Sequence, residues 1–215
     1  MTMIVAVSGN KNSGKTTLCR KLLQELEELG IRTGYIKRTS EEVLPEKGTD
    51  TELVANMGIG AVLWGRDGLR HELSPQKETT PQYIVSKYFP DSELLILEGG
   101  KNLSLPKIWV RTEGEKSPQY PGIFMVYDRF GNREGKQVYC SGEEKEIALR
   151  LSALVRGKAY RSSQIYFGDT PLPMKDFIAD FIRGSILGML ASLKGGGNLG
   201  KSVRIYLDGN PENKK

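Results

Sequence analysis

Residues 9–16 combine the residue types that hold phosphate groups. The stretch reads GNKNSGKT and matches the pattern G-x-x-x-x-G-K-[ST] without a mismatch. Glycines let successive backbone N–H groups point inward, and the N-terminus of a following helix adds partial positive charge at the same place. Lys15 is expected to reach the terminal phosphates of a nucleotide, and the Thr16 hydroxyl to coordinate Mg²⁺. The predicted nucleotide-binding residues are Gly9, Asn10, Lys11, Asn12, Ser13, Gly14, Lys15, Thr16 and Thr17.

The sequence on either side of this loop predicts a strand before it and a helix after it. Residues 4–7 read IVAV, a short apolar run rich in β-branched residues, which is typical of a strand buried on both faces of a parallel sheet. After the loop, leucines recur at helical spacing until Gly30 ends the pattern. This context favours a phosphate-binding loop over the alternative, a simple glycine turn before an amphipathic helix.

An acidic side chain follows a second apolar run. Leucines and an isoleucine at 94–97 lead directly into Glu98, and two glycines come next. The carboxyl end of a strand is where open α/β sheets bind ligands, and a nucleoside triphosphatase needs an acid there to hold or orient the metal and its waters. We therefore predict that Glu98 is a Walker B-like acid, with a catalytic role beside Lys15. Asp50 is a candidate second acid on the metal side, although a solvated loop aspartate is the alternative.

The remaining pattern predicts one α/β domain. Strands are expected at 31–37, 107–112 and 122–128, and helices at 49–57, 81–88 and 143–155. Residues 60–64 and 69–73 flank a polar tip bounded by glycines and predict a β-hairpin. Parallel strands alternating with helices imply a doubly wound mixed sheet of the P-loop NTPase-like kind, with the hairpin adding antiparallel strands.

The character of the sequence changes near Gly157, so we predict a nucleotide-binding domain at 1–156 and a C-terminal extension at 157–215. The extension is expected to form a strand, a long helix and a closing strand at 202–207. One broad apolar stripe on the helix consists of Phe177, Phe181, Ile182, Leu187 and Leu190. So small a piece cannot bury this stripe alone, so it must dock on the main domain, which we prefer, or on another subunit.

The composition narrows the class of protein. The chain has 215 residues, of which 38% are hydrophobic and 27% charged, both ordinary fractions for a globular protein. Its net charge of +5 is a weak indication of acidic partners, for which phosphates are the obvious candidates. The chain lacks an apolar run of about 18 residues and a signal-peptide pattern, so we expect a cytoplasmic protein with no membrane partner. Basic and acidic residues are interspersed, which argues against nucleic-acid binding. Cys19 and Cys140 form no C-x-x-C motif and His71 is the single histidine, so we expect buried structural thiols and no zinc site.

The order of three motifs resembles that of the MobB family of molybdopterin-guanine dinucleotide biosynthesis adaptor proteins. The motifs are GNKNSGKTTL, GYIKRTSEEVLPEKGTDTELVANMGIGAVLW and LLILEGGKNLSLPKIWVRT, and the resemblance covers residues 1–156. The positions that match the family's pattern are Lys37, Asp50, Gly60, Ala61, Glu98, Gly99, Lys101, Pro106, Lys107 and Ile108. The sequence departs from the pattern at Arg38, where the family usually has histidine, and in TSEEVLPEKG, which replaces a stretch that is often rich in histidine.

The resemblance implies a GTP-binding protein, usually dimeric, with weak GTPase activity at most. Such a protein assists a molybdenum cofactor guanylyltransferase that joins GMP to molybdopterin. The implied ligands are GTP with Mg²⁺ and, through basic side chains, the anionic molybdopterin. The candidate cofactor-binding residues are Lys37, Arg38, Lys101 and Lys107, each of which could equally be a surface charge.

Guanine specificity comes from the resemblance alone, because the N-K-x-D signature of many GTPases is absent. Asp128, in the sequence YDRFGN, is interpreted as a turn former rather than a base reader. Two alternatives stay open. A P-loop small-molecule kinase would usually need an arginine-rich lid, which the sequence does not show. A metallochaperone-type GTPase would need clustered histidine and cysteine ligands, against which one histidine and two distant cysteines argue.

Overall fold

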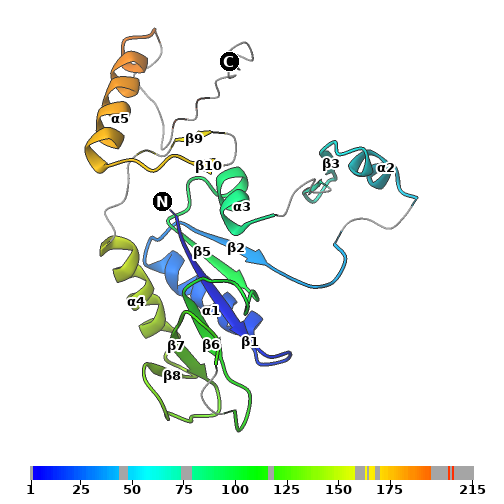
Figure 1. Cartoon of the computed structure of the whole chain (residues 1–215), viewed down its shortest axis with the longest axis vertical. Helices are drawn as coiled ribbons and strands as arrows, with labels where there is room; N and C mark the ends of the chain where they lie inside the picture. Colours follow the sequence, from blue (N-terminus) through cyan, green and yellow to red (C-terminus); the bar gives the residue numbers. More distant parts are fainter. Residues whose placement is uncertain are drawn as a thin grey trace.

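A six-stranded sheet forms the centre of the computed structural model (Figure 1). The structure describes residues 2–43, 48–73, 79–115, 119–157, 163, 165–167, 170–194, 203 and 205. The strand order is β2-β5-β1-β6-β7-β8, and all five pairings are parallel. The strands are β1 (Met3–Gly9), β2 (Thr33–Lys37), β5 (Leu94–Glu98), β6 (Lys107–Val110), β7 (Ile123–Asp128) and β8 (Val138–Cys140). The predicted α/β class is confirmed, while the short strand β8 was not predicted.

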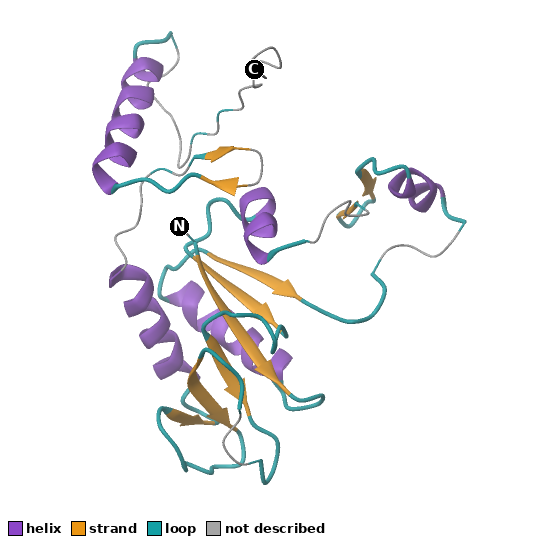
Figure 2. Cartoon of the chain, viewed as in Figure 1, coloured by secondary structure: helices purple, strands orange, loops and turns teal. Residues whose placement is uncertain are grey.

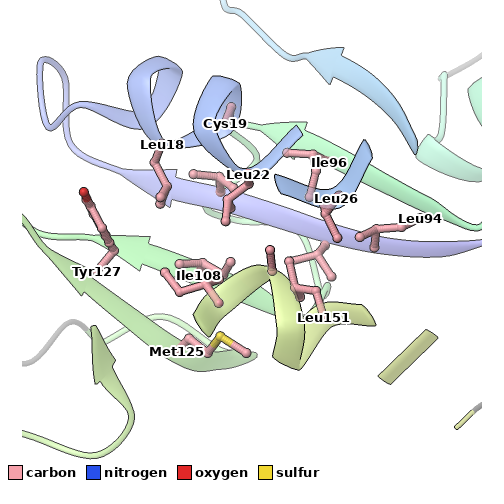
Figure 3. Close-up of a cluster of buried hydrophobic side chains, with 14 of the residues drawn as sticks. Leu18, Cys19, Leu22, Leu26, Leu94, Ile96, Ile108, Met125, Tyr127 and Leu151 are labelled. Atoms are coloured by element: carbon pink, nitrogen blue, oxygen red, sulfur yellow. The ribbon is translucent and has the colours of Figure 1, made fainter. Parts of the chain in front are cut away.

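Helices cover both faces of this sheet, as a doubly wound fold requires. Helices α1 (Lys15–Glu28) and α4 (Glu144–Gly157) pack on one face. Helix α3 (Pro81–Tyr88) and the segment after β5 cover the other face. Leu18, Leu22 and Leu26 lie one turn apart on α1 and point into the main core, where they meet Ile96 and Ile108 from the sheet (Figure 3). The leucine spacing therefore determines which side of α1 faces the sheet. That orientation places the first turn of α1, which contains Lys15 and Thr16.

The predicted hairpin forms, but it does not join the main sheet. Strands β3 (Ala61–Trp64) and β4 (Leu69–Glu72) pair antiparallel with each other and, with α2 (Asp50–Asn56), stand apart from the six-stranded sheet (Figure 2). The expectation that the hairpin adds antiparallel strands to the sheet was therefore wrong. Alternation predicts pairing within a hairpin, because that pairing is local, but it does not specify which edge, if any, the hairpin extends.

The C-terminal extension begins with a small hairpin of β9 (Tyr166–Phe167) and β10 (Thr170–Pro171), followed by α5 (Asp176–Ala191). The predicted closing strand falls mostly outside the described residues, and its two described members, Val203 and Ile205, belong to no strand. In the apolar stripe of α5, Phe177 and Phe181 are 79% and 66% exposed, whereas Ile182, Leu187 and Leu190 are half-buried. Docking of this stripe on the main domain, which we preferred, therefore stays a prediction. No helix in the described part of the chain is long and apolar enough to cross a membrane.

Candidate functional site

The loop between β1 and α1 has a tightly curled backbone at its two glycines, Gly9 and Gly14, as the sequence predicted. Gly14 precedes α1 with a φ of 96°, in the left-handed region that glycine adopts without strain. A Cβ on Gly9 would collide with the backbone oxygen of Val110 and lie 2.7 Å from Ser13 Oγ. Strand β6 thus passes so close to the loop that no side chain fits at residue 9.

Polar groups in this loop are arranged as an anion would require. The Lys15 ammonium donates a hydrogen bond to the backbone oxygen of Asn10, at 2.5 Å, so its side chain folds back over the loop. Burial lowers the pKa of Lys15, and the negative charge of Glu98 opposes that shift. Ser13 Oγ is buried and has no hydrogen-bond partner among the described residues. A buried polar atom without a partner is unusual, and a ligand seated in the loop would supply one.

Glu98 ends β5 beside the first turn of α1 and is only 5% exposed. One carboxylate oxygen accepts a hydrogen bond from the Thr16 hydroxyl at 2.8 Å, and the other accepts one from the Tyr35 hydroxyl at 2.7 Å. The Lys37 ammonium lies 4.0 Å from the first of these oxygens. The structure therefore brings the predicted acid and the predicted metal-binding threonine into direct contact, although 82 residues separate them.

The sequence analysis missed Tyr35. It lies two residues before Lys37 on β2, so both side chains leave the strand on the same face, and the register pairs Lys37 with Glu98. Burial, and then the hydrogen bond to Glu98, raise the pKa of the Tyr35 hydroxyl, which therefore remains a donor at neutral pH. Once β2 and β5 are known to be neighbours, the alternation of residues along β2 is the signal that could have identified Tyr35.

Thr16 and Glu98 fit the Mg²⁺ that accompanies nucleotides in phosphate-binding loops. Hydroxyl and carboxylate oxygens are the hard donors that this ion prefers. Asp50 is not brought to this place, since α2, which begins at Asp50, lies far from the loop between β1 and α1 (Figure 1). Within the described residues there is no group of three or more His, Cys, Asp or Glu side chains that could hold a metal. Two of the three predicted metal-binding residues, Thr16 and Glu98, therefore lie together, and the third, Asp50, lies elsewhere.

The four candidate cofactor-binding residues lie in different surroundings. Lys37 is exposed beside Glu98, and the next residue, Arg38, donates its backbone N–H to the Glu98 backbone oxygen at 2.9 Å. Lys101 lies 5.8 Å from the centre of the Tyr120 ring. Lys107 differs because it is fully buried: its ammonium donates to the backbone oxygens of Leu103 and Pro121, at 2.7 and 2.6 Å. Lys107 holds two loops together here, whereas binding roles for the other three stay predictions.

The loop after β6 contacts the phosphate-binding loop through Glu115, which the sequence analysis also missed. One Glu115 oxygen accepts hydrogen bonds from the Asn10 side chain at 3.3 Å and from the Trp109 indole at 3.0 Å. The other accepts from the Thr112 backbone and hydroxyl, at 2.9 and 2.8 Å. Glu115 thereby ties Asn10 to the end of β6, and no local sequence signal announces a contact across 105 residues.

Asp128 acts as a turn former, as interpreted from the sequence. Its Oδ1 accepts hydrogen bonds from the backbone N–H groups of Phe130 and Asn132, at 2.8 and 3.3 Å. Its Oδ2 lies 3.6 Å from the guanidinium of Arg111, and both residues are 2% exposed. Arg111 in turn donates to the backbone oxygen of Glu134 at 2.7 Å. Asp128 is therefore committed to holding the loop after β7.

The two cysteines, Cys19 and Cys140, are free and buried as expected, and burial raises the pKa of Cys19 to about 12.

Comparisons with known proteins identify a family for this chain. Residues 4–124 match the family model of MobB, the molybdopterin guanine dinucleotide synthesis protein B. A molybdopterin-guanine dinucleotide biosynthesis adapter protein of Escherichia coli (strain K12) is 29% identical over 119 residues, or 53% of this chain and 68% of that protein. A Bacillus subtilis (strain 168) relative is 27% identical over 115 residues, which cover 52% of this chain and 66% of the relative, just under two thirds of its length. The crystal structure of a MobB homolog from Bacillus stearothermophilus aligns with a TM-score of 0.53 at 22% identity, covering 72% of this chain and 99% of the homolog, and so supports the fold.

Proposed function

This chain belongs to the MobB family, and we propose that it is a GTP-binding adapter protein that assists the attachment of GMP to molybdopterin in molybdenum cofactor biosynthesis. The observation that carries the proposal is the hydrogen bond between Thr16 and Glu98. It joins the hydroxyl of a phosphate-binding loop to the acid of the neighbouring strand, the pairing expected of a nucleoside triphosphate site. The name of the Escherichia coli relative supports the adapter role.

Each group of the site has a distinct part in this proposal. The loop amides and the Lys15 ammonium hold the β- and γ-phosphates, while Thr16 and Glu98 hold the Mg²⁺ ion. When bound, that ion would neutralise phosphate charge and polarise the terminal phosphate. Tyr35 keeps the Glu98 carboxylate oriented toward Thr16. Charge stabilisation and positioning provide most of the rate in phosphoryl transfer, and no arginine finger or dedicated base is evident in the sequence, so we expect slow GTP hydrolysis.

We further propose that the chain works in the cytoplasm as a homodimer that meets a molybdenum cofactor guanylyltransferase. The exposed part of the apolar stripe of α5, Phe177 and Phe181, supports an association of two copies, because large exposed apolar patches mark interaction surfaces. Sedimentation equilibrium of the full chain tests this proposal, and a monomer at micromolar concentration would refute it.

Calorimetric titration tests the nucleotide assignment. GTP, ATP and molybdopterin, each with Mg²⁺, would be added to the wild type, to Lys15→Ala and to Lys145→Ala. Lys145 is an exposed lysine on α4 and serves as the matched control. We expect micromolar binding of GTP, weaker binding of ATP, and loss of GTP binding in Lys15→Ala alone. Unchanged binding in Lys15→Ala would refute the loop assignment, and preference for ATP would favour the kinase alternative.

A further inference from the structure

The direction of a bound nucleotide follows from the order of the strands. Thr16 and Glu98 mark where the metal and the terminal phosphate belong, and Glu98 lies on β5, on one side of β1. Strands β6 and β7 lie on the other side of β1. The carboxyl ends of parallel strands share one edge of the sheet, and β5 and β7 are three strand spacings apart, about 14 Å. A nucleotide whose terminal phosphate faces β5 therefore extends its nucleoside toward the loop after β7.

Hydrogen bonds hold the backbone of that loop, which carries an arginine that reaches the phosphate-binding loop. Asp128 fixes its backbone through the two hydrogen bonds and the Arg111 contact described above. The next residue, Arg129, is exposed, yet a Cβ built on Gly14 would lie 3.4 Å from its Nη1 and 3.7 Å from its Cδ. Both the aliphatic stem and the guanidinium of Arg129 thus run alongside Gly14, the residue just before α1.

The chemistry of Arg129 suits a purine nucleoside. Within the described part of the chain Arg129 forms no ion pair with a carboxylate, and its guanidinium lies 4.9 Å from the centre of the Phe130 ring. A guanidinium is flat, weakly hydrated and always charged, so it stacks on aromatic rings, including nucleobases. We infer that Arg129 contacts the nucleoside half of the bound nucleotide, with its guanidinium plane against the base. This inference rests on the proposed function, and it assigns a residue to the part of the ligand that the phosphate-binding loop does not hold.

Two ligands separate a nucleoside contact from a phosphate contact. GTP and inorganic tripolyphosphate, each with Mg²⁺, would be titrated into the wild type, Arg129→Ala, Arg129→Lys and Arg133→Ala. Arg133 is the matched control, because it lies in the same loop but pairs with Glu143 at 2.6 Å. We expect Arg129→Ala to bind GTP about tenfold more weakly, at the low end of what stacking on a base contributes, and to bind tripolyphosphate as the wild type does. Arg129→Lys keeps the positive charge but lacks the planar guanidinium, so it should lose most of the same tenfold in GTP affinity.

Each outcome decides a separate point. Equal losses for GTP and tripolyphosphate in Arg129→Ala would show a phosphate contact and overturn the nucleoside assignment. Wild-type affinity for GTP in Arg129→Ala, or a matching loss in Arg133→Ala, would also overturn it while leaving the proposed function intact. If the wild type binds no GTP at all, or if Lys15→Ala binds it normally, the proposed function fails and this inference falls with it.

Discussion

The buried pair of Arg111 and Asp128 gives a stability prediction with a defined sign. Asp128→Asn keeps the volume of the side chain and can keep Oδ1 as the acceptor for Phe130 and Asn132. It removes the negative charge opposite Arg111, which is itself 2% exposed. The substitution therefore leaves a buried guanidinium without its counter-charge and preserves the turn.

The size of the effect follows from the separation of the charges. At 3.6 Å and an effective dielectric constant of about 20, the attraction between the two charges is about 4 to 5 kcal/mol. Breaking a buried ion pair by removing one partner typically costs about 3 to 5 kcal/mol. Arg111 keeps its hydrogen bond to the Glu134 backbone oxygen, so we expect a loss of about 3 kcal/mol in the free energy of unfolding. For a chain of this size, such a loss lowers Tm by about 10 °C.

Urea unfolding followed by circular dichroism measures this loss, with Glu143→Gln as the control. Glu143 and Arg133 form a shorter ion pair, at 2.6 Å, but their side chains are 31% and 62% exposed, so the control should lose little stability. In an Arg111→Met background Asp128→Asn should cost much less, since no buried charge is left unpaired. The reasoning is refuted if Asp128→Asn costs less than about 1 kcal/mol, or if it costs the same in both backgrounds.

Two further predictions concern the metal and the buried lysine. Glu98→Gln should weaken GTP binding strongly in Mg²⁺ but little in EDTA, because it removes a negative charge that would bind the metal. Glu93→Gln, at the other end of β5, is the control. Calorimetric titration measures both variants, and equal losses of affinity in the two buffers would contradict the metal role of Glu98. Burial lowers the pKa of Lys107, so between its folded pKa and the ordinary value of 10.5 the unfolded chain binds more protons and stability rises with pH. The free energy of unfolding of the wild type, relative to Lys107→Met, should therefore increase from pH 7 toward pH 10 in urea titrations, and a constant difference would show that burial does not lower the pKa of Lys107.

The sequence predicted the features that depend on local pattern. The phosphate-binding loop, the leucine-lined helix after it and the acid at the end of β5 each follow from a short run of residues whose spacing has a physical reason. The hairpin was predicted for the same reason, because its two strands are neighbours in the chain. What the sequence could not supply is which distant segments meet. Tyr35 and Glu115 join the site only through the order of the strands, and neither belongs to a motif.

Lys107 shows how a family pattern and a structure can assign different roles to one residue. Its match to the family's pattern made it a candidate for an anionic ligand, yet its ammonium is buried between the Leu103 and Pro121 backbone oxygens. A Cβ on Gly122 would collide with the backbone oxygen of Leu105, so the segments on either side of Lys107 pass very close to each other. An ammonium that bridges two such segments fixes the path of the loop after β5, on which Lys101 lies.

The site is therefore best understood as the meeting of four consecutive strand ends. Glu98 ends β5, the phosphate-binding loop follows β1, Glu115 follows β6 and Arg129 follows β7. Glu98 and Glu115 each hydrogen-bond to a residue of the central loop or of the helix turn after it, and Arg129 lies against Gly14. Because these contacts reach the central loop from both sides, a ligand that moved this loop would also change its contacts with Glu98, Glu115 and Arg129.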